Sequence, residues 1–345
     1  MRHPNFKRFG APPTSVGLMS RLAYVRAKTA GIDLKPLLIK AELTLHEIED
    51  PRVRLRVRDQ ITFLNLVASA LQDDLLGFHL ALLPDLRAIG LLYYVLASSD
   101  ILGEALQRGV RCSSIVNEGV YLKYIDDRDV GISFNYVGVS RHLDRHQIEF
   151  LMTETVRICR QLTGVRLVPS RVRLTHHRHR TCSEFAEFFG ERVEFGATVD
   201  EMSFDSTIKH MPIISADPYL NKLLIAYCEE ALPRRPTNRG SFRSRVENSI
   251  VPLLPHGEAR ADEIARRLGI SQRKLARLLS FEGLTYSKIL EGLRFELAEH
   301  YLANEDLSIS QISWLLGYQE VSAFTHAFKR WTGKTPREAR SHIAF

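Results

Sequence analysis

The sequence predicts an α+β N-terminal domain followed by an all-α C-terminal domain in which a long helix joins two helix-turn-helix units. Alternating apolar residues between helical patterns indicate strands within the first 232 residues. A stretch rich in proline and arginine interrupts every periodicity at 233–240, and nothing after it resembles a strand of any length. At 345 residues, with 45% hydrophobic and 25% charged residues, the chain has the length of two domains and the composition of a globular protein.

The charge and cysteine content favour a protein of the cytoplasm. Lys plus Arg total 47 against 40 Asp plus Glu, and the net charge of +7 suits a polyanionic partner without requiring one. No apolar run approaches the roughly 20 residues that cross a bilayer, and the basic N-terminus lacks the apolar segment of a secretory signal. Four scattered cysteines without a CxxC pair are typical of reduced thiols. We therefore expect a cytoplasmic chain with no membrane partner.

The first 232 residues divide into an arm and a domain. Residues 1–19 contain Gly10, Pro12, Pro13 and Gly17, and we expect a flexible arm there. Residues 20–232 combine helical and alternating patterns, which is typical of an α+β domain. The expected elements are helices within 20–112, a β-hairpin over 118–138 with a charged turn, a helix over 145–162, strands within 165–175 and 192–204, and a closing helix over 218–232.

A linker is expected at 233–240, because its prolines fix the backbone and remove hydrogen-bond donors. The remaining residues, 241–345, are predicted to form the helical C-terminal domain. Two segments within it, about 261–281 and 308–331, have the pattern of helix-turn-helix units.

The first unit has a short helix, a glycine turn and a second helix with a polar face. Ala265 provides a small side chain where the two helices would cross, Gly269 ends the first helix, and Ser271 stands at the N-cap of the second. The polar face of the second helix carries the side chains that we expect to contact phosphates or base edges: Ser271, Gln272, Arg273, Lys274 and Arg277.

The second unit repeats this arrangement. Ser308 and Gln311 form a capping-box pattern, Ser313 occupies the small position, and Gly317 ends the helix. The apolar side of the following helix carries Phe324 and Phe328. Its other side offers the remaining candidate DNA contacts: Gln319, Glu320, Ser322, Ala323, Thr325, His326, Lys329 and Arg330.

A continuous helical pattern over 285–303 separates the two units. A helix of that length spans roughly 28 Å at about 1.5 Å per residue. Successive major grooves on one side of B-DNA lie about 34 Å apart. The spacing predicts that one molecule reads two segments of double-stranded DNA about one helical turn apart.

Residues 317–336 resemble the signature of AraC/XylS-type transcriptional regulators, through Ser-x-Phe-x-x-x-Phe-Lys-Arg at 322–330 and Gly-Lys-Thr-Pro at 333–336. The likeness extends over about 260–340. Residues 20–232 are similar, less specifically, to the effector-binding and dimerisation domain of the ornithine-utilisation and mycobacterial virulence regulators. The resemblance implies a bacterial regulator, usually an activator, which binds promoter DNA, contacts RNA polymerase, responds to a small-molecule effector and forms a homodimer.

Three residues depart from the family pattern. His326 stands where the family usually has Arg or Lys, Ser313 replaces an alanine, and Ala339 replaces an aromatic residue. Because His326 removes a permanent cation from the second unit, the first unit is expected to supply more of the affinity. We therefore predict that Arg273→Ala weakens specific binding more than His326→Ala.

No pattern predicts an enzyme or a cofactor. The sequence has no Gly-x-Ser-x-Gly or HExxH motif, and Gly-Lys-Thr at 333–335 lacks the earlier glycine of a phosphate-binding loop, because Phe328 stands there. A non-specific architectural DNA-binding protein is the alternative to a sequence-specific regulator. Such a protein would bind every duplex with similar affinity.

Two further segments leave alternatives open. His176, His177, His179 and Cys182 are a candidate metal-ligand cluster, although a solvated strand end with interleaved arginines is the simpler interpretation and we predict no metal site. The apolar run 91–96 is typical of a hydrophobic core, and lining a ligand pocket is its alternative role.

Overall fold

A computed structural model of the chain describes residues 12–178, 183–232, 242–302 and 307–343. Backbone contacts divide the chain into two compact units, Met1–Ser241 and Phe242–Phe345. The predicted linker at 233–240 lies outside the described residues. No helix within the described residues combines the length and apolar character needed to cross a membrane.

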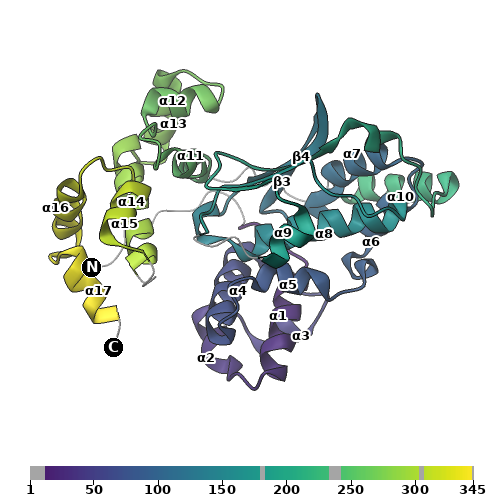
Figure 1. Ribbon diagram of the computed structural model, residues 1–345, viewed down its shortest axis with the longest axis horizontal. Coiled ribbons are helices and arrows are strands. Elements are labelled where there is room, and N and C mark those ends of the chain that lie inside the picture. The colour runs from purple at the N-terminus through teal and green to yellow at the C-terminus, as the bar shows by residue number, and fades with distance from the viewer. Residues whose placement is uncertain (1–11, 179–182, 233–241, 303–306, 344–345) are drawn as a thin grey trace. The chain divides into compact units, whose positions relative to one another are not determined.

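The N-terminal unit begins with a layer of helices that share one hydrophobic core (Figure 1). The capping box of Thr44 and Glu47 starts one of them, and Phe63 and Phe150 are fully buried between them. The helices of this layer are α1 (Leu18–Thr29), α2 (Leu34–Lys40), α3 (Leu45–Glu49), α4 (Val57–Leu71) and α5 (Leu76–Leu82).

A five-stranded sheet follows, in the order β3-β4-β7-β5-β6. The predicted hairpin is confirmed, with β3 (Val120–Asp126) antiparallel to β4 (Asp129–Tyr136). β7 (Asp200–Asp205) pairs with β4, β5 (Arg171–Leu174) pairs antiparallel with β7, and β6 (Val193–Phe195) runs parallel to β5. The sheet is therefore mixed.

Further helices cover this sheet and extend the unit. α7 (Leu102–Cys112) and α8 (His146–Thr163) share the large core with the strands. α6 (Leu91–Ala97) contributes Tyr93 and Leu96 to that core, which agrees with the core interpretation of the 91–96 run. α10 (Pro218–Ala231) packs on α6 and α7 around a small cluster that includes Cys112 and Cys228.

The structure differs from the expectations in three places. Residues 14–19 of the expected arm include β1 (Thr14–Ser15), which pairs with β2 (Leu55–Arg56), and the start of α1. Only 171–174 of the alternating 165–175 segment is a strand. Pro169 has no backbone N–H to donate to a neighbouring strand, and the Leu167 carbonyl accepts a hydrogen bond from Arg160 Nε at 2.8 Å. The 192–204 segment forms two strands rather than one, and α9 (Ser183–Phe189) precedes them.

The C-terminal unit is entirely helical within its described residues, as predicted, and has one core. α11 (Phe242–Ile250) buries Val246 and Ile250 in that core. α14 is the longest helix among the described residues of this unit (Figure 1), and both of the shorter helix pairs share the same core with it. The other elements of this unit are α12 (Ala261–Arg267), α13 (Gln272–Phe281), α14 (Tyr286–Leu302), α15 (Ile309–Leu315), α16 (Val321–Thr332) and α17 (Pro336–Ile343).

Candidate nucleic-acid interface

The α12–α13 pair has the turn that its sequence predicts. Gly269 has a φ of 66°, a left-handed conformation in which a side chain is strained. The backbone N–H of Ile270 then donates to the carbonyl of Ala265 at 3.0 Å, which closes the end of α12. Ser271 Oγ accepts from the backbone N–H of Lys274 at 3.2 Å and begins α13. Leu275 and Leu279 are buried, which turns the opposite face of α13 outward.

The outer face of α13 concentrates unpaired positive charge. Arg266 and Arg267 of α12 both pair with Glu263, at 2.7 and 3.1 Å. Those hydrogen bonds, from Arg266 first, lower the pKa of Glu263 to about 2. The cations of α13 make no ion pair with any described residue and are exposed, so their donors face solvent. The five candidates that sequence analysis assigned to this unit all lie on this exposed surface: Ser271, Gln272, Arg273, Lys274 and Arg277.

The α15–α16 pair begins with the predicted capping box. Gln311 Oε1 accepts from the backbone N–H of Ser308 at 2.8 Å, and Ser308 Oγ accepts from that of Gln311 at 3.2 Å. Gly317 ends the helix with a φ of 74°, and a Cβ there would lie 2.4 Å from the Leu254 carbonyl oxygen. Glycine is therefore required by both conformation and space.

Ser313 keeps its hydroxyl satisfied although it is buried where the helices cross. Its side chain is 2% exposed, as is Ala265 at the corresponding position of the first pair. Ser313 Oγ donates to the carbonyl of Glu320 at 3.4 Å, across the turn. Serine in place of alanine therefore adds a hydrogen bond and leaves no hydroxyl buried without a partner at this position.

The exposed surface of α16 carries less free charge than that of α13. Arg330 pairs with Glu291 of α14 at 2.8 Å, and the same carboxylate oxygen accepts from Trp331 Nε1 at 2.8 Å. Thr325 is half-buried and donates to the Val321 carbonyl at 2.9 Å. The other candidates predicted for this unit are all exposed: Gln319, Glu320, Ser322, Ala323, His326 and Lys329.

Arg294 is a positioning residue that the sequence analysis did not identify. From α14 it donates through Nε to the Leu316 carbonyl at 2.9 Å and through a terminal nitrogen to the Gly317 carbonyl at 3.2 Å. Its guanidinium also lies 4.5 Å from the centre of the Tyr318 ring. Arg294 stands four residues after Leu290 and next to the buried Leu293, and a cation on that apolar side is the signal that marks it.

Of the candidate metal ligands, His176 contacts protein side chains through both ring nitrogens. His176 Nε2 lies 2.9 Å from Glu149 Oε1, and its Nδ1 lies 3.1 Å from an Arg141 nitrogen. His179 and Cys182 lie outside the described residues. Within the described residues no group of three or more His, Cys, Asp or Glu side chains is placed to hold a metal ion.

Comparison with known proteins assigns the family. A profile described as the arabinose-binding N-terminal domain of the AraC transcription regulator matches residues 31–213. A helix-turn-helix domain profile matches residues 264–342, which include both helix pairs of the C-terminal unit except the start of α12. Because the first match covers more than half of the chain, this protein belongs to the AraC family of transcription regulators.

Two relatives show how the likeness is distributed. The HTH-type transcriptional regulator VirS of Mycobacterium tuberculosis is 35% identical over 198 residues, which cover 56% of each chain. The ornithine utilization regulator of Pseudomonas aeruginosa is 28% identical over 316 residues, covering 90% of this chain and 91% of the relative. A solved structure, CdpR of Pseudomonas aeruginosa, aligns over 97% of this chain at 20% identity with a TM-score of 0.46.

Proposed function

We propose that this protein is a sequence-specific DNA-binding transcription regulator. The observation that carries the proposal is the exposed, unpaired face of Arg273, Lys274 and Arg277 on α13, held by a glycine turn and a serine cap. Phosphate contacts from such cations position a protein on DNA, and base contacts from the same helix specify the sequence. The second helix pair, joined through α14, would read an adjacent segment.

The N-terminal unit is proposed to bind a small-molecule effector, as the name of its family profile indicates for AraC itself. Effector binding would shift the population of molecules that can place both helix pairs on DNA. We also propose that the bound regulator activates transcription by contacting RNA polymerase in the cytoplasm. In this proposal the protein binds DNA and an effector and catalyses no reaction.

A second copy of the chain is the proposed partner of α10. Tyr219, Leu223 and Tyr227 lie on one side of this helix and are 76%, 52% and 62% exposed. Leu223 lies midway between the tyrosines, so a two-fold antiparallel pairing would place Tyr219 of one copy against Tyr227 of the other. With the neighbouring Ile214, these side chains expose on the order of 500 Å². This area is more than half of the roughly 800 Å² that each partner buries in a standard interface, so the patch could form the centre of a dimer contact.

The experiment that tests DNA recognition is fluorescence anisotropy with tiled fragments from upstream of the gene and its neighbours. It is run at two salt concentrations with scrambled competitor. Binding that is confined to one or two fragments and survives the competitor is expected. Equal binding to every fragment that collapses with salt would instead support the non-specific architectural protein.

A further inference from the structure

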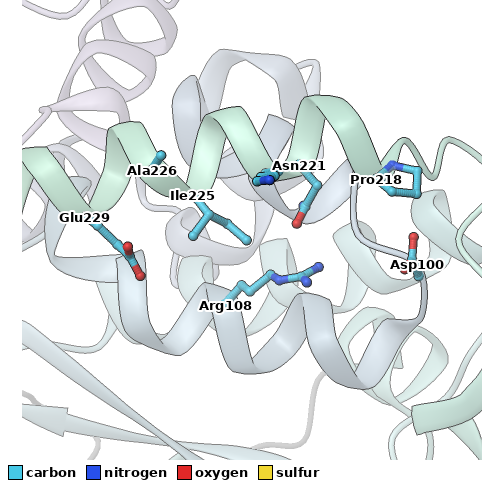
Figure 2. Close-up of a pocket in the computed structure, with 8 residues that line it drawn as sticks. Asp100, Arg108, Pro218, Asn221, Ile225, Ala226 and Glu229 are labelled. Carbon is cyan, nitrogen blue, oxygen red and sulfur yellow. The ribbon is translucent and has the colours of Figure 1, made fainter.

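A charged groove lies between α7 and α10 in the N-terminal unit (Figure 2). Its volume is about 390 Å³, within the usual range for small-molecule sites. The backbone of α10 forms one wall, α7 forms the other, and the chain around residue 100 closes one end. The groove is lined by Asp100, Arg108, Pro218, Asn221, Lys222, Ile225, Ala226 and Glu229.

Arg108, which lines this groove, has a guanidinium nitrogen without an acceptor. Its Nη2 lies 3.1 Å from Glu104 Oε2, one turn earlier on α7. Its Nη1 is shielded from solvent and has no hydrogen-bond partner among the described residues. A shielded guanidinium N–H without an acceptor costs free energy, and a ligand oxygen would remove that cost. Arginine meets carboxylates with particularly good geometry.

Asn221 presents a fixed acceptor beside that guanidinium. Its Nδ2 donates to the Val95 carbonyl at 2.9 Å and to Ser98 Oγ at 2.9 Å, which fixes the orientation of the amide. Figure 2 shows the amide oxygen directed toward the Arg108 head group. Asp100 lies at the same end of the groove, and Lys222 also lines it. Both are exposed, and neither has an ion-pair partner among the described residues.

The opposite end is less polar and its carboxylate is engaged. Ile225 and Ala226 of α10 provide an apolar wall, and Figure 2 shows Glu229 beyond them, one turn further along the helix. Glu229 pairs with Arg111 of α7 at 2.7 Å. The groove therefore offers free charges of both signs at one end and an apolar wall leading away from them.

We propose that this groove binds a free α-amino acid. Arg108 and Lys222 take the carboxylate, Asp100 and the Asn221 amide oxygen take the ammonium group, and the side chain lies along Ile225 and Ala226. A ligand held this way bridges α7 and α10, the last described helix before the C-terminal unit. This assignment rests on the proposed effector response, because it names the effector class and its site.

The test begins with the full-length chain and each of the twenty standard L-amino acids, measured as a rise in the unfolding temperature. The best binder is then titrated by calorimetry. Two analogues of it are titrated in parallel, one without the amino group and one without the carboxylate. The amino acid is expected to bind at least tenfold more tightly than either analogue. If no amino acid raises the unfolding temperature, the proposal is wrong.

Variants locate the site. Arg108→Gln and Asp100→Asn are each expected to raise the Kd at least tenfold, and Lys222→Gln, at an exposed position where folding is not at risk, at least threefold. The matched control is Arg128→Gln, in the exposed turn between β3 and β4, which should leave the Kd unchanged. Binding that survives all three groove substitutions would place the ligand elsewhere and overturn the assignment.

The same variants separate this assignment from the proposed function. DNA anisotropy on the specific fragment is measured for each variant without amino acid. Specific DNA binding with no amino-acid binding would reject the groove and leave the regulator intact. Amino-acid binding without specific DNA binding would keep the groove as a ligand site and reject the regulator.

Discussion

At the scale of single residues, the two helix pairs differ in how much positive charge they leave free. Arg273 is exposed and makes no ion pair with a described residue, whereas His326 carries no permanent charge and Arg330 is held by Glu291. We predict that Arg273→Ala lowers the affinity for the specific fragment roughly tenfold or more, as expected for a side chain that contacts a guanine or a phosphate. His326→Ala should lower it less than about threefold. Anisotropy titrations of both variants at one salt concentration measure the ranking.

The control for this comparison is Arg266→Ala, since Arg266 is also exposed but is neutralised by Glu263. It should change the affinity less than Arg273→Ala does. Equal losses for Arg273→Ala and His326→Ala, or a larger loss for His326→Ala, would show that the second pair supplies at least as much of the affinity as the first.

Glu154 makes stability depend on pH. Its carboxyl is buried in α8, its Oε1 has no hydrogen-bond partner among the described residues, and burial raises its pKa to about 8. The carboxyl of Glu154 therefore keeps its proton up to about pH 8 in the folded state, whereas it releases that proton near pH 4.5 in the unfolded state. The stability that the protonated carboxyl contributes to the fold is fully present below about pH 4.5 and is lost as pH rises through about 8. We predict that Glu154→Gln raises the stability at pH 8 by a few kcal/mol.

Chemical denaturation of the wild type and of Glu154→Gln at pH 5.5 and pH 8 measures this effect. The advantage of the variant should be clearly larger at pH 8 than at pH 5.5. Glu201→Gln, at a half-buried position of β7, is the matched control and should show no such difference. An advantage that is the same at both pH values would mean that the carboxyl of Glu154 does not titrate in this range.

At the scale of elements, Arg294 connects α14 to the turn of the second pair. Arg294→Ala leaves the carbonyls of Leu316 and Gly317 without this donor and removes the cation from the Tyr318 ring. The loss of stability is expected to be about 1–3 kcal/mol. We predict that the variant protects the DNA segment read by α13 normally and protects the segment read by α16 weakly, as measured by hydroxyl-radical footprinting.

Lys288→Ala is the matched control for Arg294, because Lys288 is an exposed cation on the same helix. Its footprint should match that of the wild type on both segments. Uniform weakening of both segments by Arg294→Ala would show that the residue stabilises the whole unit and does not position α16 in particular.

The elements also show which features the sequence could predict. The hairpin, α8, α10 and both glycine turns follow local rules of alternation, helical spacing and capping, and these predictions were confirmed. α9 was missed because its packing partner is far away in the sequence: Phe185 and Phe189 of this helix pack on Phe78. The pairing of Arg330 with Glu291 was missed for the same reason, since those residues are far apart in the sequence.

At the scale of the whole C-terminal unit, both helix pairs belong to one core, so their separation is expected to be fixed. α14 has 17 residues and spans roughly 26 Å at about 1.5 Å per residue. One rigid unit should read two segments about one helical turn apart and should not follow them when they are moved. We predict that inserting five base pairs between the two segments of the specific fragment lowers the affinity to that of one segment alone. Inserting ten base pairs, which restores the face of the duplex but adds about 34 Å, should not recover it.

Anisotropy on the original, five-pair and ten-pair fragments measures this dependence, and a fragment with ten pairs inserted outside both segments controls for length. The expected order is full affinity for the original and the control, and a similar reduced affinity for both internal insertions. If the ten-pair insertion recovered full affinity, the two helix pairs that contact DNA could not be held at a fixed separation by one rigid α14, because that helix cannot lengthen by a turn of DNA. Such a recovery would require a flexible connection, as in two copies of the chain that each occupy one segment.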